Sequence, residues 1–192
     1  MIIGASGAKP SRTADLERKL VHHCSPALAG LKPANMFVYR EGADAGEIPD
    51  GSAALSALDS TKFAQELGIC RKKLEPCGVR IEILAQRKTG LLLYVYRPTM
   101  LREYLAQPEV FRYLQDEGYD PSDLSACIAK LHRRICGTDL AATLSGSCAF
   151  PHEIGFFLGY PYDDVLGFIE NKGENSLCSG CWKVYSRARD AQ

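Results

Sequence analysis

The chain has 192 residues, enough for one domain with a full hydrophobic core. Lys and Arg together number 23, as do Asp and Glu, so the formal net charge is zero. With 46% hydrophobic and 24% charged residues, the composition excludes a chain that is disordered throughout. The neutral balance also argues against a nucleic-acid partner, because binding to phosphates draws on a surplus of basic side chains.

No membrane or export segment is predicted. The most apolar stretch, residues 90–96, is far shorter than the roughly 18–20 residues that a membrane-spanning helix needs. The N-terminus lacks a basic segment followed by a long apolar one, so we expect no signal peptide, no membrane partner and a cytoplasmic location. Most of the eight cysteines should then be free thiols. We expect one domain over residues 11–187, with flexible ends at residues 1–10 and 188–192.

The first third of the chain predicts helices around one strand. Thr13 is a suitable N-cap for a first helix, and Pro26 should prevent its simple continuation. Residues 35–40 are expected to form a strand. Short helices are predicted within residues 53–67, with Gly68 as their end.

A β-hairpin is the clearest local pattern. Val79, Ile81 and Ile83 alternate with charged residues, which is typical of a half-buried strand. Residues 87–90 form the predicted turn. Residues 91–96 are apolar throughout, which favours a central strand covered on both faces.

Helices dominate the rest of the chain. The pattern predicts helices over residues 100–105 and 108–118, and a third that starts at Asp120 and Pro121 and ends at Gly137. Two short helices, each with a proline in its first turn, should then form a tight hairpin between residues 151 and 173. With a weak final strand over residues 181–185, the expected class is α+β (mixed α/β). The expected architecture is a small, largely antiparallel sheet with packed helices and a C-terminal αα-hairpin.

Three sequence blocks resemble a known family. They are HCSPALAGLKPANMF at residues 23–37, LLLYVYRP at residues 91–98, and FPHEIGFFLGYPYDDVLGFIENKG at residues 150–173 with CWKVY at residues 181–185. Together they resemble a bacterial family that is described only as a domain of unknown function, over about Leu20 to Tyr185. The resemblance implies no activity. The polar residues that match the motif words of this family are His23, Cys24, Arg97, His152, Glu153, Glu170, Asn171, Lys172 and Trp182.

Cys24 and His152 are the candidate catalytic pair. If Ser25 and Pro26 begin a short helix, Cys24 lies just ahead of its N-terminus, where the partial positive charge stabilises a thiolate. His152, beside Pro151 in a predicted first helical turn, would serve as the base. The alternatives are a buried cysteine at a helix–turn junction and a histidine of the capping region.

Cys178 and Cys181 form a CxxC pair. Such a pair supplies two ligands of a zinc site, and Cys148 with His152, or His23 with Cys24, could supply the others. The dithiol could equally be redox-active, or the two cysteines could lie there without a shared role. Zinc is therefore the one cofactor that the sequence suggests.

Arg97, Glu170, Asn171 and Lys172 are candidate substrate-binding residues. Arg97 follows the predicted central strand, where a guanidinium can bind an anionic group or form an ordinary ion pair. Lys172 and Gly173 also suit a helix C-terminus, which requires neither Glu170 nor Asn171. Two functions are therefore predicted: a small-molecule-binding protein or Cys/His-dependent enzyme, and a metal-binding or thiol-redox protein. A protein-interaction module built on the helical hairpin is a third.

Overall fold

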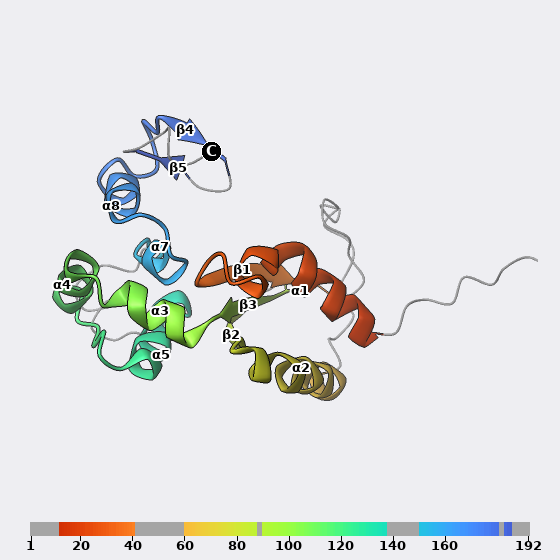
Figure 1. Ribbon diagram of the computed structural model, residues 1–192. Helices are drawn as coiled ribbons and strands as arrows, with labels where there is room; N and C mark the ends of the chain where they lie inside the picture. Colours follow the sequence, from red (N-terminus) through yellow and green to blue (C-terminus); the bar gives the residue numbers. More distant parts are fainter. Residues whose placement is uncertain (1–11, 41–59, 88–89, 138–149, 181–182, 186–192) are drawn as a thin grey trace, which may run out of the picture.

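The computed structural model describes residues 12–40, 60–87, 90–137, 150–180 and 183–185. It is a mixed α+β fold, as the sequence predicts (Figure 1). Its elements in chain order are α1 (Arg12–Leu28), β1 (Ala34–Tyr39), α2 (Ser60–Leu74), η1 (Glu75–Cys77), β2 (Arg80–Arg87), β3 (Gly90–Tyr96), α3 (Pro98–Leu105), α4 (Pro108–Asp116), α5 (Leu124–Ile135), α7 (Ile154–Phe157), α8 (Tyr162–Glu170), β4 (Cys178–Ser179) and β5 (Lys183–Val184).

The main sheet is antiparallel and has the strand order β1-β3-β2. β2 and β3 form the predicted hairpin, with Arg80 opposite Tyr96 and Arg87 opposite Gly90. The register shifts between Ile83 and Ala85, so Leu84 is the extra residue of a β-bulge. β1 pairs with the other side of β3, which makes β3 the central strand.

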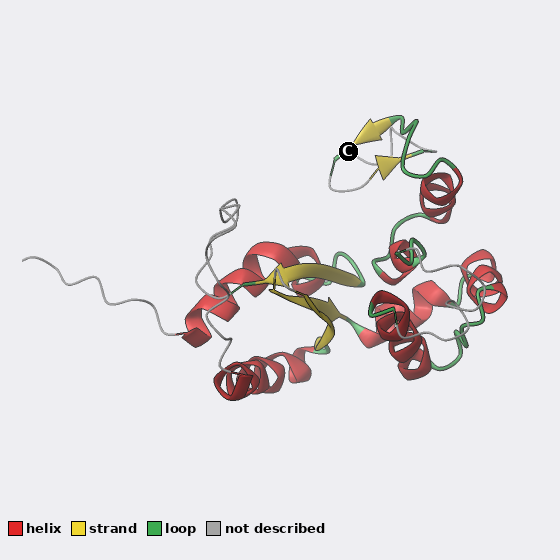
Figure 2. Cartoon of the chain, turned by 180° about the vertical axis from the view of Figure 1, so that it is seen from behind, coloured by secondary structure: helices red, strands yellow, loops and turns green. Residues whose placement is uncertain are grey.

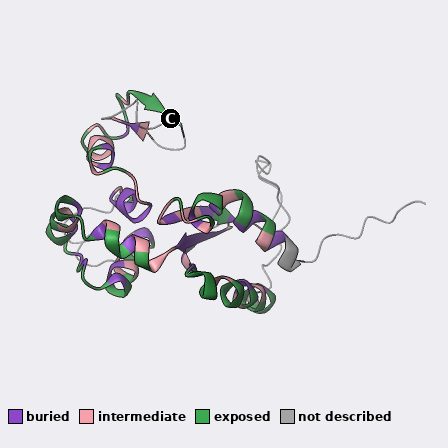
Figure 3. Cartoon of the chain, in the orientation of Figure 1, coloured by how far each residue is buried: buried purple, intermediate pink, exposed green. Residues whose placement is uncertain are grey.

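β3 is covered on both faces, as its apolar sequence predicts. Alternate residues point to opposite faces of a strand. Leu91, Leu93 and Val95 pack in one cluster with apolar residues of α1 and α2. Leu92, Tyr94 and Tyr96 pack in a second cluster with residues of α3, α4, α5, α7 and α8. Figure 3 shows β3 as largely buried, and Figures 1 and 2 show α1 and α2 beside the main sheet, with the later helices gathered apart from them.

α1 continues through Pro26 to Leu28, so the predicted break at this proline is wrong. Two side chains from elsewhere in the chain support the disrupted end of the helix. The Ala27 N–H donates to Asn35 Oδ1 at 3.1 Å. Arg97 donates from Nε to the Ala27 carbonyl at 2.6 Å and from Nη2 to the Leu28 carbonyl at 2.5 Å, and so satisfies carbonyls that a helix end leaves free.

Two other helix boundaries differ from the predicted ones. α2 runs through Gly68, whose Cα faces open space, so this glycine neither ends the helix nor serves a close contact. α5 begins at Leu124 because the Asp123 side chain accepts hydrogen bonds from the Ser125 and Ala126 N–H groups. Asp120 instead accepts from the Ser122 N–H in a turn ahead of the helix.

The C-terminal helices form the predicted hairpin. α7 and α8 are joined through Gly159, which has a φ of +74° and lies so close to the Pro33 ring that a Cβ would come within 2.2 Å of it. The short strands β4 and β5 follow and pair with each other. They contact α8, since the Tyr185 side chain covers Gly167 and its N–H donates to Asp164 Oδ1 at 2.8 Å. Within the described residues, none of the helices has the length and apolar character to cross a membrane.

Gly159 offers a direct test of this packing, because Gly137 has a similar φ of +67° but open space around it. Both Gly159→Ala and Gly137→Ala impose the strain of a left-handed alanine. Only Gly159→Ala adds the clash with Pro33, so it should lower the free energy of unfolding by about 1–3 kcal/mol more than Gly137→Ala. Chemical denaturation measures both values, and equal losses would contradict the contact between Gly159 and Pro33.

Candidate functional site

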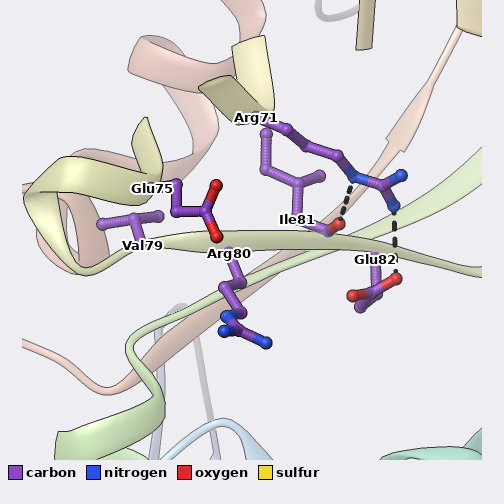
Figure 4. Close-up of a pocket in the computed structure, with 6 residues that line it drawn as sticks. All are labelled: Arg71, Glu75, Val79, Arg80, Ile81 and Glu82. Carbon is purple, nitrogen blue, oxygen red and sulfur yellow. Dashed lines mark hydrogen bonds and ion pairs between the residues drawn. The ribbon is translucent and has the colours of Figure 1, made fainter. Parts of the chain in front are cut away.

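A pocket opens beside the free edge of β2, where the C-terminal end of α2 and η1 pass the strand (Figure 4). Its lining consists of two arginines, two glutamates and two apolar residues: Arg71, Glu75, Val79, Arg80, Ile81 and Glu82. Val79 and Ile81 are buried and pack with α1 and α2. Arg80 and Glu82 alternate with them and so belong to the opposite face of the strand.

Arg71 extends across the edge of β2 and covers part of that edge. Its Nε donates to the Ile81 carbonyl at 2.9 Å, and its Nη2 donates to Glu82 Oε2 at 3.2 Å (Figure 4). A free strand edge can pair with another chain through its unpaired main-chain groups. Since Arg71 occupies the Ile81 carbonyl, the pocket is better suited to a small ligand than to an added strand.

The other two charged residues of the pocket are Arg80 and Glu75. Arg80 is exposed and lies opposite Tyr96 in the sheet. The pKa of Tyr96 is raised by burial and by the charge of Glu82, and Arg80 opposes this shift. Glu75 is exposed, and its carboxylate has no hydrogen bond or ion pair among the residues that the structure describes. The pocket therefore presents both signs of charge.

Reasoning from the sequence did not select these pocket residues. Arg71 and Glu75 are spaced i, i+4 at the end of a helix, and Arg80 and Glu82 are the polar half of the alternating strand pattern. Each pair has an ordinary structural explanation in the sequence. Only the packing of α2 against β2 brings the two pairs together.

Cys24 does not have the environment that the sequence predicts for it. It lies within α1, not ahead of a helix N-terminus, and its side chain is 0% exposed in the cluster between α1, α2 and the sheet. Burial raises the pKa of the Cys24 thiol to about 12. At neutral pH this thiol is protonated and out of reach of solvent.

Arg97 follows β3, as predicted, and its guanidinium contacts main-chain carbonyls. Besides the carbonyls of Ala27 and Leu28, it donates from Nη1 to the Cys77 carbonyl at 3.0 Å. These three bonds join the ends of α1, η1 and β3. The side chain is not among those that line the pocket.

His152 and Glu153 precede α7, which begins at Ile154, so neither lies in the helix predicted to start at Pro151. The His152 ring packs against the rings of Phe168 and Phe150, with centroid distances of 5.2 and 6.1 Å. Among the described residues, no hydrogen bond or ring contact joins His152 to Cys24.

Glu170, Asn171 and Lys172 lie at the C-terminal end of α8. Asn171 donates from Nδ2 to the Gly167 carbonyl at 2.8 Å, while Glu170 and Lys172 are exposed. Gly173 has the positive φ, +78°, that its predicted capping role requires. His152 contacts this helix through Phe168, whereas Arg97 binds the end of α1, the helix that contains Cys24.

Cys178 is an exposed residue of β4, and its CxxC partner Cys181 lies outside the described residues, as does Cys148. The six cysteines of the described segments are free thiols. The same segments contain no group of three or more His, Cys, Asp and Glu side chains that could hold a metal ion.

Glu153 lies at the centre of a buried charged network. Its carboxylate accepts a hydrogen bond from the Tyr119 hydroxyl at 2.7 Å and forms an ion pair with Arg134 Nη1 at 2.6 Å. Arg134 also binds Glu117 Oε2 at 2.9 Å. Burial, and then the Glu153 charge, raise the pKa of Tyr119 well above its usual range. The network joins α5 to the segment before α7.

The Cys24 environment predicts a dependence of stability on pH. The unfolded thiol ionises near about pH 8.5, whereas the folded thiol keeps its proton to about pH 12. The stabilising contribution is therefore complete below the unfolded pKa and is lost as pH rises toward the folded one. Above about pH 8.5, stability should fall less steeply for Cys24→Ala than for the wild type, by up to about 1.4 kcal/mol per pH unit. Denaturation at successive pH values measures the two slopes, and identical slopes would refute the buried thiol.

The buried network predicts a specific pattern of losses. Arg134→Met leaves the Glu153 carboxylate buried without its cation and should cost about 3–5 kcal/mol of unfolding free energy. The double variant Arg134→Met/Glu153→Leu removes the charge as well and should be more stable than Arg134→Met alone. Arg112→Met, on the exposed side of α4, is the control and should change stability by less than about 0.5 kcal/mol. If the double variant loses as much unfolding free energy as Arg134→Met and Glu153→Leu lose together when made singly, the network is contradicted.

Comparison with known proteins gives one match. A family model described as "Protein of unknown function (DUF3793)" matches residues 20–192. No curated protein and no solved structure matches the chain.

Proposed function

The chain belongs to the DUF3793 family of proteins of unknown function, and we propose that it binds a small zwitterionic ligand in the pocket between α2 and β2. Such a ligand carries a carboxylate and an ammonium group, as an amino acid or the end of a short peptide does. The observation that supports this proposal is the lining of the pocket, where two arginines and two glutamates come together.

Arg80 is the residue that we assign to the carboxylate of the ligand. A guanidinium has five N–H donors in a planar fork that matches a carboxylate. Arg80 is exposed at the pocket, so these donors can reach a ligand.

Glu75 is the residue that we assign to the ammonium group. Its side chain is exposed at the pocket and has no ion pair within the described segments. Glu82 is less suited because it already binds Arg71. Val79 and Ile81 also line the pocket, but each is only 1% exposed, so we assign the binding to the charged groups.

The environment of Cys24 favours binding over an enzyme that uses this cysteine. Such an enzyme would need an accessible thiolate, and Cys24 is buried and protonated. The pocket requires no cysteine.

Isothermal titration calorimetry with the standard amino acids and a set of dipeptides tests this function. We expect at least one of them to bind at micromolar to millimolar concentration. Glu75→Gln and Arg80→Met should each weaken that binding about tenfold or more, equivalent to about 1.4 kcal/mol. The control variants Glu174→Gln and Arg112→Met change exposed charges outside the pocket and should bind as the wild type does.

Circular dichroism of each variant separates a loss of binding from a loss of folding. If no amino acid or dipeptide binds the folded wild-type protein at millimolar concentration, the proposal is wrong. It is also wrong if the control variants weaken binding as much as the pocket variants do.

A further inference from the structure

Cys136 and His132 form a pair on the surface at the C-terminal end of α5, remote in sequence from every residue of the pocket. Cys136 Sγ lies 3.8 Å from His132 Nε2, and both residues are exposed. We propose that Cys136 is a reactive thiol that undergoes exchange with disulfides, and that His132 is the positioning residue that promotes this reaction.

The helix holds the two groups together. Their spacing is i, i+4, which places side chains on the same face of a helix, and the Cys136 N–H donates to the His132 carbonyl at 2.9 Å. Cys136 Sγ also lies 3.4 Å from the Leu84 carbonyl, at the bulge of β2. The thiol is therefore fixed between a strand and an imidazole while remaining accessible to solvent.

None of the other described cysteines combines an exposed thiol with a neighbouring imidazole. Cys24, Cys70 and Cys127 are buried, and burial raises the pKa of each thiol. Cys77 and Cys178 are exposed, but within the described segments neither has an imidazole at hydrogen-bond distance. Cys77 is the better control because its sulfur lies near a main-chain carbonyl, that of Lys73, at 4.0 Å.

The imidazole matters because the end of a helix is unfavourable for an anion. The C-terminus carries a partial negative charge, and the Leu84 carbonyl accepts a hydrogen bond only from the protonated thiol. An N–H of the imidazole ring directed at the sulfur stabilises the thiolate, which is the nucleophile in exchange. Arg133, in the same turn of the helix, favours the approach of an anionic disulfide such as oxidised glutathione.

The exchange is balanced without a further oxidant. The Cys136 thiolate attacks one sulfur of the disulfide, a new S–S bond forms, and the original S–S bond breaks. The departing half leaves as a thiolate and takes up a proton equivalent to the one that Cys136 released. The product is a mixed disulfide on Cys136, beside the Leu84 carbonyl and two residues from Arg134 of the buried network.

Incubation of the full chain with oxidised glutathione at neutral pH, followed by peptide mapping with mass spectrometry, tests this inference. We expect Cys136 to be modified about tenfold faster than Cys77, well within the range for assistance by a neighbouring acid or base. His132→Asn should reduce the Cys136 rate to near that of Cys77, whereas the control His22→Asn, on α1, should leave it unchanged.

Cys136→Ser should remove the fast phase of glutathione incorporation and leave the slow phase. Melting temperatures of the variants confirm that each is folded. Modification of Cys136 no faster than that of Cys77 in the wild type would overturn the proposal, and so would a Cys136 rate that His132→Asn does not change.

Discussion

The burial of β3 on both faces is the constraint on which the rest of the structure depends. A strand that is apolar on both faces needs a helical layer on each side. The chain supplies α1 and α2 for one face and α3, α4, α5, α7 and α8 for the other. Polar groups of this strand and of the residue that follows it then connect the sheet to each layer. Arg97 follows β3 and binds the carbonyls at the end of α1, and the buried Tyr94 hydroxyl donates to the Phe157 carbonyl at 2.5 Å.

Local sequence patterns predict the parts of the fold that depend on local physics. The alternation at Val79, Ile81 and Ile83 and the apolar run over residues 91–96 define the hairpin. The boundaries that the sequence misplaces depend on distant partners. Pro26 remains within α1 where Asn35 and Arg97 supply hydrogen bonds, and no local rule for proline contains this information.

The candidate site residues show the same difference between what local sequence patterns predict and what distant packing determines. The family blocks led to Cys24, Arg97 and His152 as candidate functional residues, and in the structure Cys24 and Arg97 belong to the packing between α1 and the sheet. Glu153, from the same blocks, joins α5 to α7 through Arg134. The pocket residues look like ordinary surface charges in the sequence, because their proximity arises only when α2 packs beside the edge of β2.

Chemical-shift mapping of backbone amides in the ¹⁵N-labelled protein, during titration with a mixture of the standard amino acids, tests the pocket between α2 and β2 most directly. If a zwitterionic ligand binds there, the largest changes should fall at residues 71–82, with smaller changes at Tyr96, which lies opposite Arg80 in the sheet. Changes centred on α7, α8 or the β4–β5 pair, or an unchanged spectrum at millimolar ligand, would contradict this assignment.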